Sequence, residues 1–115
     1  MIEPIEIRAP KGARLLEIEW TDGTTTAYEH LALRALCPCA HCQGHQGPIS
    51  WVESVEKADP RGLDLVNIHE VGSYAISLEF ADGHSTGIYT FAYLRMLAKA
   101  FDASLEDKRA MTFER

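Results

Sequence analysis

The sequence has no long hydrophobic run, no cluster of basic residues and no cysteine outside one six-residue stretch. No apolar segment approaches the roughly 20 residues that a membrane-spanning helix needs, and the first ten residues lack the basic-then-apolar layout of a secretory signal. We therefore expect a cytoplasmic protein that does not enter membranes. Its 11 basic and 17 acidic residues give a formal net charge of -6. This balance disfavours nonspecific binding to nucleic acid or to anionic lipid, because both need a basic face.

The length and the composition are typical of one globular domain. A chain of 115 residues that is 46% hydrophobic and 24% charged fits a single domain that buries roughly two-thirds of its unfolded surface. We therefore predict one domain over residues 1–115, and we expect the charged residues 102–115 to form a surface tail.

Two stretches of the sequence are alike, "LEIEWTDGTTTAYEHLALRAL" (16–36) and "ISLEFADGHSTGIYTFAYLRML" (76–97). Each begins with alternating apolar and polar residues, the period of a half-buried strand. Each continues with Asp-Gly, the strongest short-range hairpin signal. Asp22 aligns with Asp82 and, after one inserted residue, Arg34 aligns with Arg95. Each copy therefore predicts a strand, a tight turn, a second strand and a short helix, whether or not the two copies arose by duplication.

The remaining segments complete the predicted fold. Residues 2–10 alternate in polarity and have prolines at their margins, which is typical of an edge strand. Residues 43–65 contain glycines and prolines without a period and predict a loop, whereas residues 65–71 predict another strand. Thr90 is expected to cap the helix of the second copy. The sequence therefore predicts an α+β fold, a mainly antiparallel sheet of about five strands built from two hairpin–helix units, with one or two packed helices.

All three cysteines lie in "CPCAHC", as Cys37, Cys39 and Cys42. An odd number cannot all form disulfides within the chain, and clustered cysteines in a reducing cytoplasm favour metal binding or redox chemistry. Pro38 stiffens the turn, which can aim three sulfurs at one point. A redox pair of Cys39 and Cys42 would leave Cys37 unexplained and lacks the strand-then-long-helix setting of thioredoxins. Metal binding is therefore the preferred hypothesis.

Zinc prefers four tetrahedral ligands drawn from thiolates and imidazoles, so the three sulfurs need a fourth ligand from among five histidines. His84 follows Asp-Gly at the tip of the second hairpin, where the turn holds its side chain rigidly. A metal bound there would clamp the two halves of the chain together. His45 lies closer in sequence, in a glycine-flanked loop, and is the alternative. An iron–sulfur cluster accepts the same ligand types and is the alternative to zinc.

The segments "LRALCPCAHCQG" and "VGSYAISLEFADGHSTGIYTFAYLR" closely resemble the gamma-butyrobetaine hydroxylase-like N-terminal domain family, over a core of about residues 5–101. This small domain is widespread in bacteria as a free-standing protein of unknown function. It also precedes gamma-butyrobetaine and trimethyllysine hydroxylases, and accompanies Mrp-type P-loop ATPases that carry iron–sulfur clusters. In the hydroxylases it holds a structural zinc through three cysteines and a histidine. The resemblance implies, by motif, the ligands Cys37, Cys39, Cys42 and His84.

The resemblance does not imply hydroxylase activity, because those enzymes hold their iron on a separate oxygenase domain through two histidines and a carboxylate. No such motif is found in this sequence. Four ligands on zinc would also leave no position for substrate or activated water. We therefore expect a non-catalytic zinc-binding module that docks onto a protein partner, an oxygenase or an Mrp-type ATPase. The alternatives are an iron–sulfur accessory protein and, less favoured, a thiol oxidoreductase.

Overall fold

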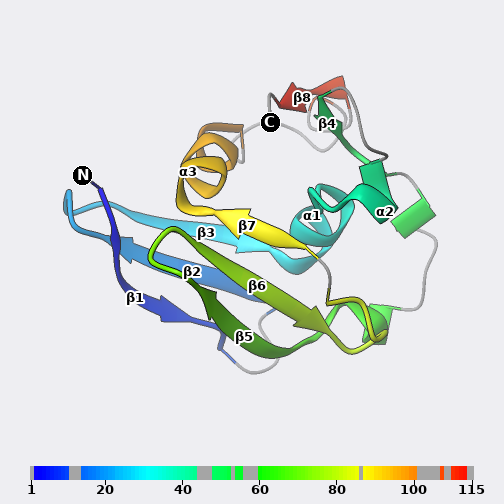
Figure 1. The fold of residues 1–115 in the computed structure, drawn as a ribbon, viewed down its shortest axis with the longest axis horizontal. Helices are drawn as coiled ribbons and strands as arrows, with labels where there is room; N and C mark the ends of the chain where they lie inside the picture. The colour runs from blue at the N-terminus through cyan, green and yellow to red at the C-terminus, as the bar shows by residue number, and fades with distance from the viewer. Residues whose placement is uncertain are drawn as a thin grey trace.

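A computed structural model describes residues 2–10, 14–43, 48–52, 54–55, 60–85, 87–100, 107 and 110–113, and the structural statements below concern these residues. Two units with the same order of elements make up most of the fold (Figure 1). The first unit consists of β1 (Pro4–Arg8), β2 (Leu15–Trp20), β3 (Thr25–Glu29) and α1 (His30–Ala35). The second unit consists of β5 (Leu65–Val71), β6 (Ala75–Phe80), β7 (Ile88–Thr90) and α3 (Phe91–Ala100).

Short elements connect and follow the two units. They are α2 (Ala40–Gln43), β4 (Ile49–Ser50), the 3₁₀ helix η2 (Pro60–Leu63) and β8 (Thr112–Phe113). The long connection predicted as a loop thus carries little regular structure where it is described. No helix in the described part of the chain is long and apolar enough to cross a membrane.

The strands form three antiparallel sheets, ordered β1-β2-β3, β5-β6-β7 and β4-β8. The α+β class and the two hairpin–helix units are therefore confirmed. The strands are divided between two three-stranded sheets and one pair, however, instead of lying in one sheet of about five. In each unit the central strand is bonded on both sides, by its hairpin partner and by the strand that precedes it. The predicted edge strand is confirmed as β1, with Pro4 at its first position.

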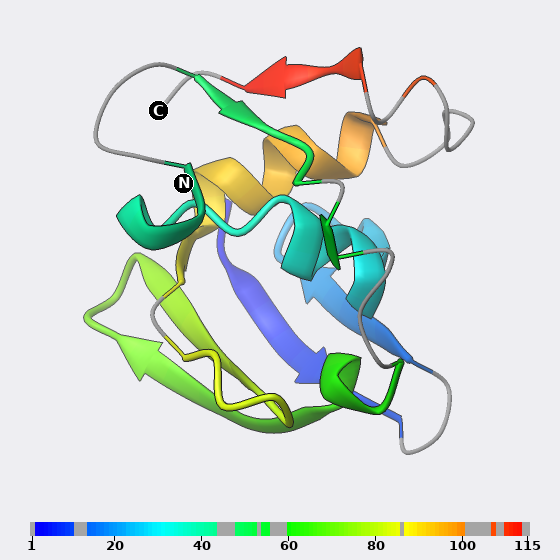
Figure 2. The ribbon, with the colours of Figure 1, turned by 90° about the vertical axis from the view of Figure 1, so that its right-hand side faces the viewer.

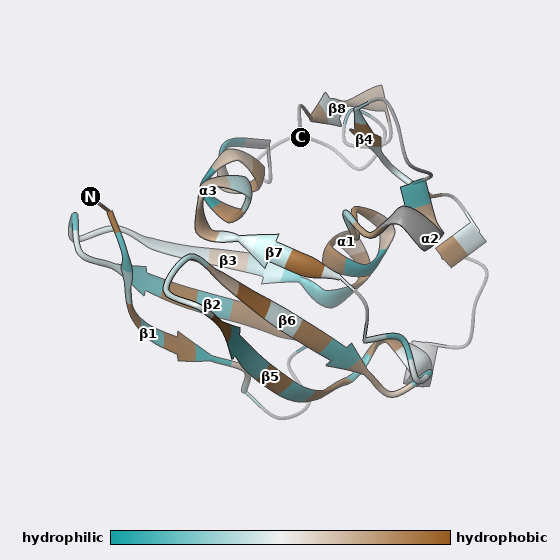
Figure 3. Cartoon of the chain, viewed as in Figure 1, coloured by the Kyte–Doolittle hydropathy of each residue, from teal (hydrophilic) through white to brown (hydrophobic). Residues whose placement is uncertain are grey.

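The core lies between the sheets and the helices. Apolar and polar residues alternate along most of β6 (Figure 3), and Leu16, Ile18 and Trp20 of β2 are fully buried. Helices α1 and α3 lie on one side of the two sheets, and the β4–β8 pair lies beyond α3 (Figures 1 and 2). The Phe113 ring of β8 meets the Tyr93 ring edge-on, with 6.1 Å between ring centroids, so this pair covers the helix side of the core.

Two buried tyrosines connect the units reciprocally. Tyr28 of β3 donates its hydroxyl hydrogen to the Leu94 carbonyl of α3 at 2.7 Å, and Tyr89 of β7 donates to the Leu33 carbonyl of α1 at 2.6 Å. Each tyrosine thus reaches the helix of the other unit. Buried carbonyls need such donors, because an unpaired buried polar group is costly.

The hairpin turns of the two units have the same pattern of hydrogen bonds. In the first turn the Trp20 amide donates to the Thr24 carbonyl at 2.9 Å, and the Thr24 amide donates to Asp22 Oδ1 at 3.0 Å. In the second turn the Phe80 amide donates to the His84 carbonyl at 2.9 Å, and the His84 amide donates to Asp82 Oδ1 at 3.0 Å. The repeat in the sequence is therefore also a repeat of backbone structure and of contacts.

Candidate metal centre

The three cysteines lie on a tight turn that begins where α1 ends. The amides of Cys42 and Gln43 both donate to the Cys39 carbonyl, at 3.2 and 3.0 Å, and this bonding starts the short helix α2. The Gln43 side chain donates to the Cys37 carbonyl at 3.2 Å, and it exchanges two hydrogen bonds with the backbone of Ser50. The turn is thereby fastened to β4, and we call residues 37–42 the cysteine turn.

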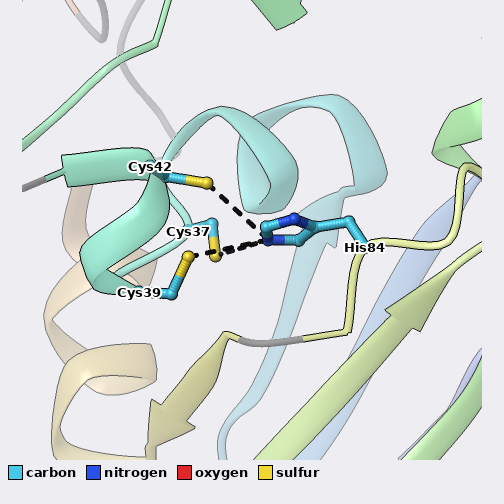
Figure 4. A group of neighbouring side chains, drawn as sticks. All are labelled: Cys37, Cys39, Cys42 and His84. Carbon is cyan, nitrogen blue, oxygen red and sulfur yellow. Dashed lines mark hydrogen bonds between the residues drawn. The ribbon is translucent and has the colours of Figure 1, made fainter.

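His84 approaches the cysteine turn from the second unit. It lies just after the hairpin turn in which Gly83 has a φ of +90°, a left-handed conformation that glycine adopts without steric cost. Asp82 accepts the His84 amide and so completes the turn. Figure 4 shows the imidazole pointing from this hairpin towards the three sulfurs.

The four predicted ligands meet at one point. His84 Nε2 lies 3.1 Å from Cys37 Sγ, 3.8 Å from Cys39 Sγ and 3.6 Å from Cys42 Sγ, and all four ligand atoms lie within 4.8 Å of one another. Zinc bonds of about 2.3 Å to sulfur and 2.0–2.1 Å to nitrogen place these atoms about 3.5 Å apart in a tetrahedron. The group therefore has the chemistry and the spacing to hold a single metal ion.

Without a metal, the thiols of Cys37 and Cys42 favour their neutral form. Burial raises the pKa of Cys37 to about 12, although the Cys39 backbone N–H partly offsets this effect. Burial and the neighbouring Cys39 also raise the pKa of Cys42, which Arg34 partly opposes. A bound cation reverses this preference, because metal ligation requires thiolates and releases their protons. Metal affinity at this site is therefore expected to rise with pH.

Cys37 Sγ occupies the space that a side chain at position 87 would fill, and Gly87 has no side chain. A Cβ atom at position 87 would come within 2.5 Å of Cys37 Sγ and 3.0 Å of the Tyr89 ring. The backbone just before β7 therefore passes so close to the cysteine turn that a side chain at position 87 would not fit.

A family model for gamma-butyrobetaine hydroxylase-like N-terminal domains matches residues 7–95. The chain belongs to this family. A protein of unknown function from Acidithiobacillus ferrooxidans, assigned to the DUF971 family, is 36% identical in its crystal structure. That match has a TM-score of 0.61 and covers 84% of this chain and 92% of the other.

Two solution NMR structures are similar over 96% of this chain. One is 29% identical with a TM-score of 0.68 over 83% of its own length, and the other is 26% identical with a TM-score of 0.70 over 78%. No curated protein matches the chain significantly. The resemblance stated from the two sequence motifs is thus confirmed at the level of the family.

In this gamma-butyrobetaine hydroxylase-like N-terminal domain, the structure brings together Cys37, Cys39, Cys42 and His84 as the motifs implied. The alternative ligand His45 lies outside the described residues. Arg34 and Gly87 were missed as parts of the site. The alignment of Arg34 with Arg95 was the one signal for the arginine, and it gave no reason to place the side chain beside sulfur.

Proposed function

We propose that this domain is a non-catalytic module whose fold is stabilised by one zinc ion bound to Cys37, Cys39, Cys42 and His84. The observation that carries the proposal is the spacing of the four ligand atoms, which suits one tetrahedral ion. Three thiolates and one neutral imidazole complete the coordination of zinc. The ion then has no open position for substrate or water, and its contribution is to stability.

An iron–sulfur cluster is the second candidate, because iron accepts the same ligand types. A cluster distributes its protein ligands over separate iron atoms and therefore holds them farther apart than one ion does. A set of ligand atoms within 4.8 Å of one another supports the single ion over the cluster. Thiol redox catalysis is disfavoured as well, because reactive cysteines have lowered pKa values, whereas the pKa of Cys42 is raised by burial and by Cys39.

The test is the metal content and the metal dependence of stability. Protein purified without added metal should be colourless and hold one zinc per chain by elemental analysis. Removing the zinc should lower the melting temperature, since a ligand at about a thousand times its Kd contributes about 4 kcal/mol. His84→Ala should abolish that response, whereas Thr24→Ala, at the matching position of the first hairpin, should retain it. A brown sample with equal iron and sulfide, or an unchanged melting temperature after zinc removal, would contradict the proposal.

We further propose that the domain docks onto a larger protein, an oxygenase or an Mrp-type P-loop ATPase. Support comes from an apolar groove of ≈ 420 Å³ that adjoins the cysteine turn at Pro38 and is lined in part by Ile88 and Met96, two exposed apolar side chains. Calorimetric titration against a purified Mrp-type ATPase from the same organism should give binding that Ile88→Glu weakens. Equal binding by the variant would contradict the use of this groove.

A further inference from the structure

Arg34 contacts both halves of the candidate metal centre. Its side chain is only 16% exposed, and its Nη1 donates to Cys42 Sγ at 3.4 Å. Its Nε faces Asp82 Oδ2 at 3.4 Å, and the other oxygen of Asp82 accepts the His84 amide. One guanidinium therefore contacts a sulfur ligand and the carboxylate that shapes the turn carrying the imidazole ligand.

The first hairpin supplies an internal comparison without thiols. Arg95 of α3 aligns with Arg34, and its Nη2 donates to Asp22 Oδ2 at 2.9 Å. Its Nη1 donates to Thr24 Oγ1 at 2.9 Å, and Thr24 is the counterpart of His84. Both arginines thus bind the aspartate of the other unit's turn. Only Arg34 directs its second donor to a sulfur.

The charge expected at the metal site suggests why Arg34, unlike Arg95, contacts a sulfur. A divalent ion, three thiolates and a neutral imidazole carry a net charge of -1, and part of that charge lies on buried Cys37. A buried charge needs an opposite charge or hydrogen bonds. The guanidinium carries one positive charge and several N–H groups in a fixed plane, so it can compensate the site and hold two of its parts at once.

We propose that Arg34 is a positioning residue of the metal centre, which holds Cys42 Sγ and the His84 turn in the binding geometry and compensates the negative charge of the metal–thiolate group. The proposal rests on the function proposed above. Residues that contact metal ligands typically change metal affinity about 10–100-fold when they are substituted. Lysine at position 34 would keep the charge but lose the planar pair of donors, and glutamine would lose the charge.

The experiment measures zinc affinity by competition with a chromophoric chelator, on full-length wild type, R34K, R34Q, and the matched controls R95K and R95Q. Both Arg34 variants should bind zinc about 10–100-fold more weakly, with R34Q the weaker, while the Arg95 variants stay within about twofold of wild type. The Arg95 variants lose an ion pair of the same type elsewhere in the fold, so they control for stability alone.

Cobalt(II) substitution adds a readout that stability does not move. A hydrogen bond to a thiolate lowers the energy of its lone pairs, so R34Q should shift the sulfur-to-cobalt charge-transfer band to longer wavelength, and R95Q should not. If R34Q does not fold, the zinc affinity and the cobalt charge-transfer band of R34K test the proposal instead. Wild-type affinity and an unmoved band in the Arg34 variants would overturn the inference. A wild type that binds neither zinc nor cobalt would instead overturn the proposed function.

Discussion

Lack of space for a side chain explains why residue 87 is a glycine. Gly87 does not adopt the left-handed backbone conformation found at Gly23 and Gly83, so backbone freedom does not account for it. A Cβ atom would collide with Cys37 Sγ, 2.5 Å away, and the sulfur cannot retreat easily because Cys37 is fully buried. The glycine therefore permits the position of one ligand atom.

Gly87→Ala is accordingly expected to push Cys37 Sγ out of the binding geometry. Overpacking of this kind typically costs about 1–3 kcal/mol, and zinc affinity should fall with it. Unfolding of metal-free protein in denaturant measures the cost, and chelator competition measures the affinity. In a Cys37→Ala background the sulfur is gone, so Gly87→Ala should then cost much less. An equal cost in both backgrounds would place the clash elsewhere.

His30 links stability to pH independently of the metal ligands. It is 5% exposed, so its side chain is largely removed from water. Burial lowers the pKa of His30 below its ordinary value of 6.5; nearby Asp64 opposes this shift and Arg14 adds to it. Well above pH 6.5 both the folded and the unfolded states are neutral at this position. As the pH falls below 6.5, the unfolded state takes up a proton before the folded state does, and stability is lost until the folded pKa is passed.

His30→Phe should therefore lose less stability than wild type between pH 7.5 and pH 5.5. Denaturant unfolding at the two pH values gives the difference, and the metal site cancels because both proteins contain it. A His30→Phe variant with the wild-type slope would exclude His30 as the source.

The grouping of the three cysteines with His84 could be predicted from the sequence, whereas the residues around them could not. The cysteine spacing and the histidine after Asp-Gly are local patterns, and few structures other than a metal site are typical of them. The contact between Arg34 and Cys42 depends on how α1 packs against the second hairpin. Gly87 was invisible for the same reason, because nothing near it in the sequence shows that Cys37 lies opposite.

At the scale of elements, the two tyrosine contacts look equivalent but satisfy different needs. Leu33 lies in the last turn of α1, whose final carbonyls have no helical partner, and Tyr89 supplies a donor to it. Leu94 lies early in α3, where the helix itself can bond its carbonyl, so Tyr28 adds a second donor there. Loss of Tyr89 should therefore leave a buried acceptor unpaired.

We expect Tyr89→Phe to cost about 1–3 kcal/mol, the penalty of an unsatisfied buried group, and Tyr28→Phe about 0.5–1.5 kcal/mol, the net value of one hydrogen bond. Denaturant unfolding followed by circular dichroism, with both variants in the same metal state, measures the two costs. A cost for Tyr28→Phe equal to or above that of Tyr89→Phe would contradict the distinction between the two carbonyls.

The elements themselves were predictable, but their assembly was only partly so. Alternation and Asp-Gly identified both hairpins, and Thr90 caps α3 as expected, accepting the Tyr93 amide at 3.0 Å. The division into separate sheets was missed, because alternation shows which side chains are buried and not which strand edges pair. Residues 102–115, predicted as a tail, are described only at 107 and 110–113, where Phe113 is buried in β8.

For the whole molecule, the candidate metal site is an asymmetric connection between two similar units. Three of its four candidate ligands follow α1 of the first unit, and the fourth lies on the hairpin of the second. The corresponding hairpin of the first unit is held by Arg95 and Thr24 without a metal. Metal removal should therefore loosen one turn and spare its counterpart.

Amide hydrogen exchange followed by mass spectrometry can test this asymmetry within one molecule. Zinc removal should speed exchange in the cysteine turn, residues 37–42, and in the second hairpin turn, residues 81–85. Residues 21–24 should change little, because the hydrogen bonds from Arg95 to Asp22 and Thr24 hold that turn and do not depend on the ion. Local opening of this kind is expected where a stabilising contact is lost without global unfolding. Equal acceleration in both hairpin turns would mean that the ion stabilises the fold as a whole and does not act as a clamp between residues 37–42 and the second hairpin.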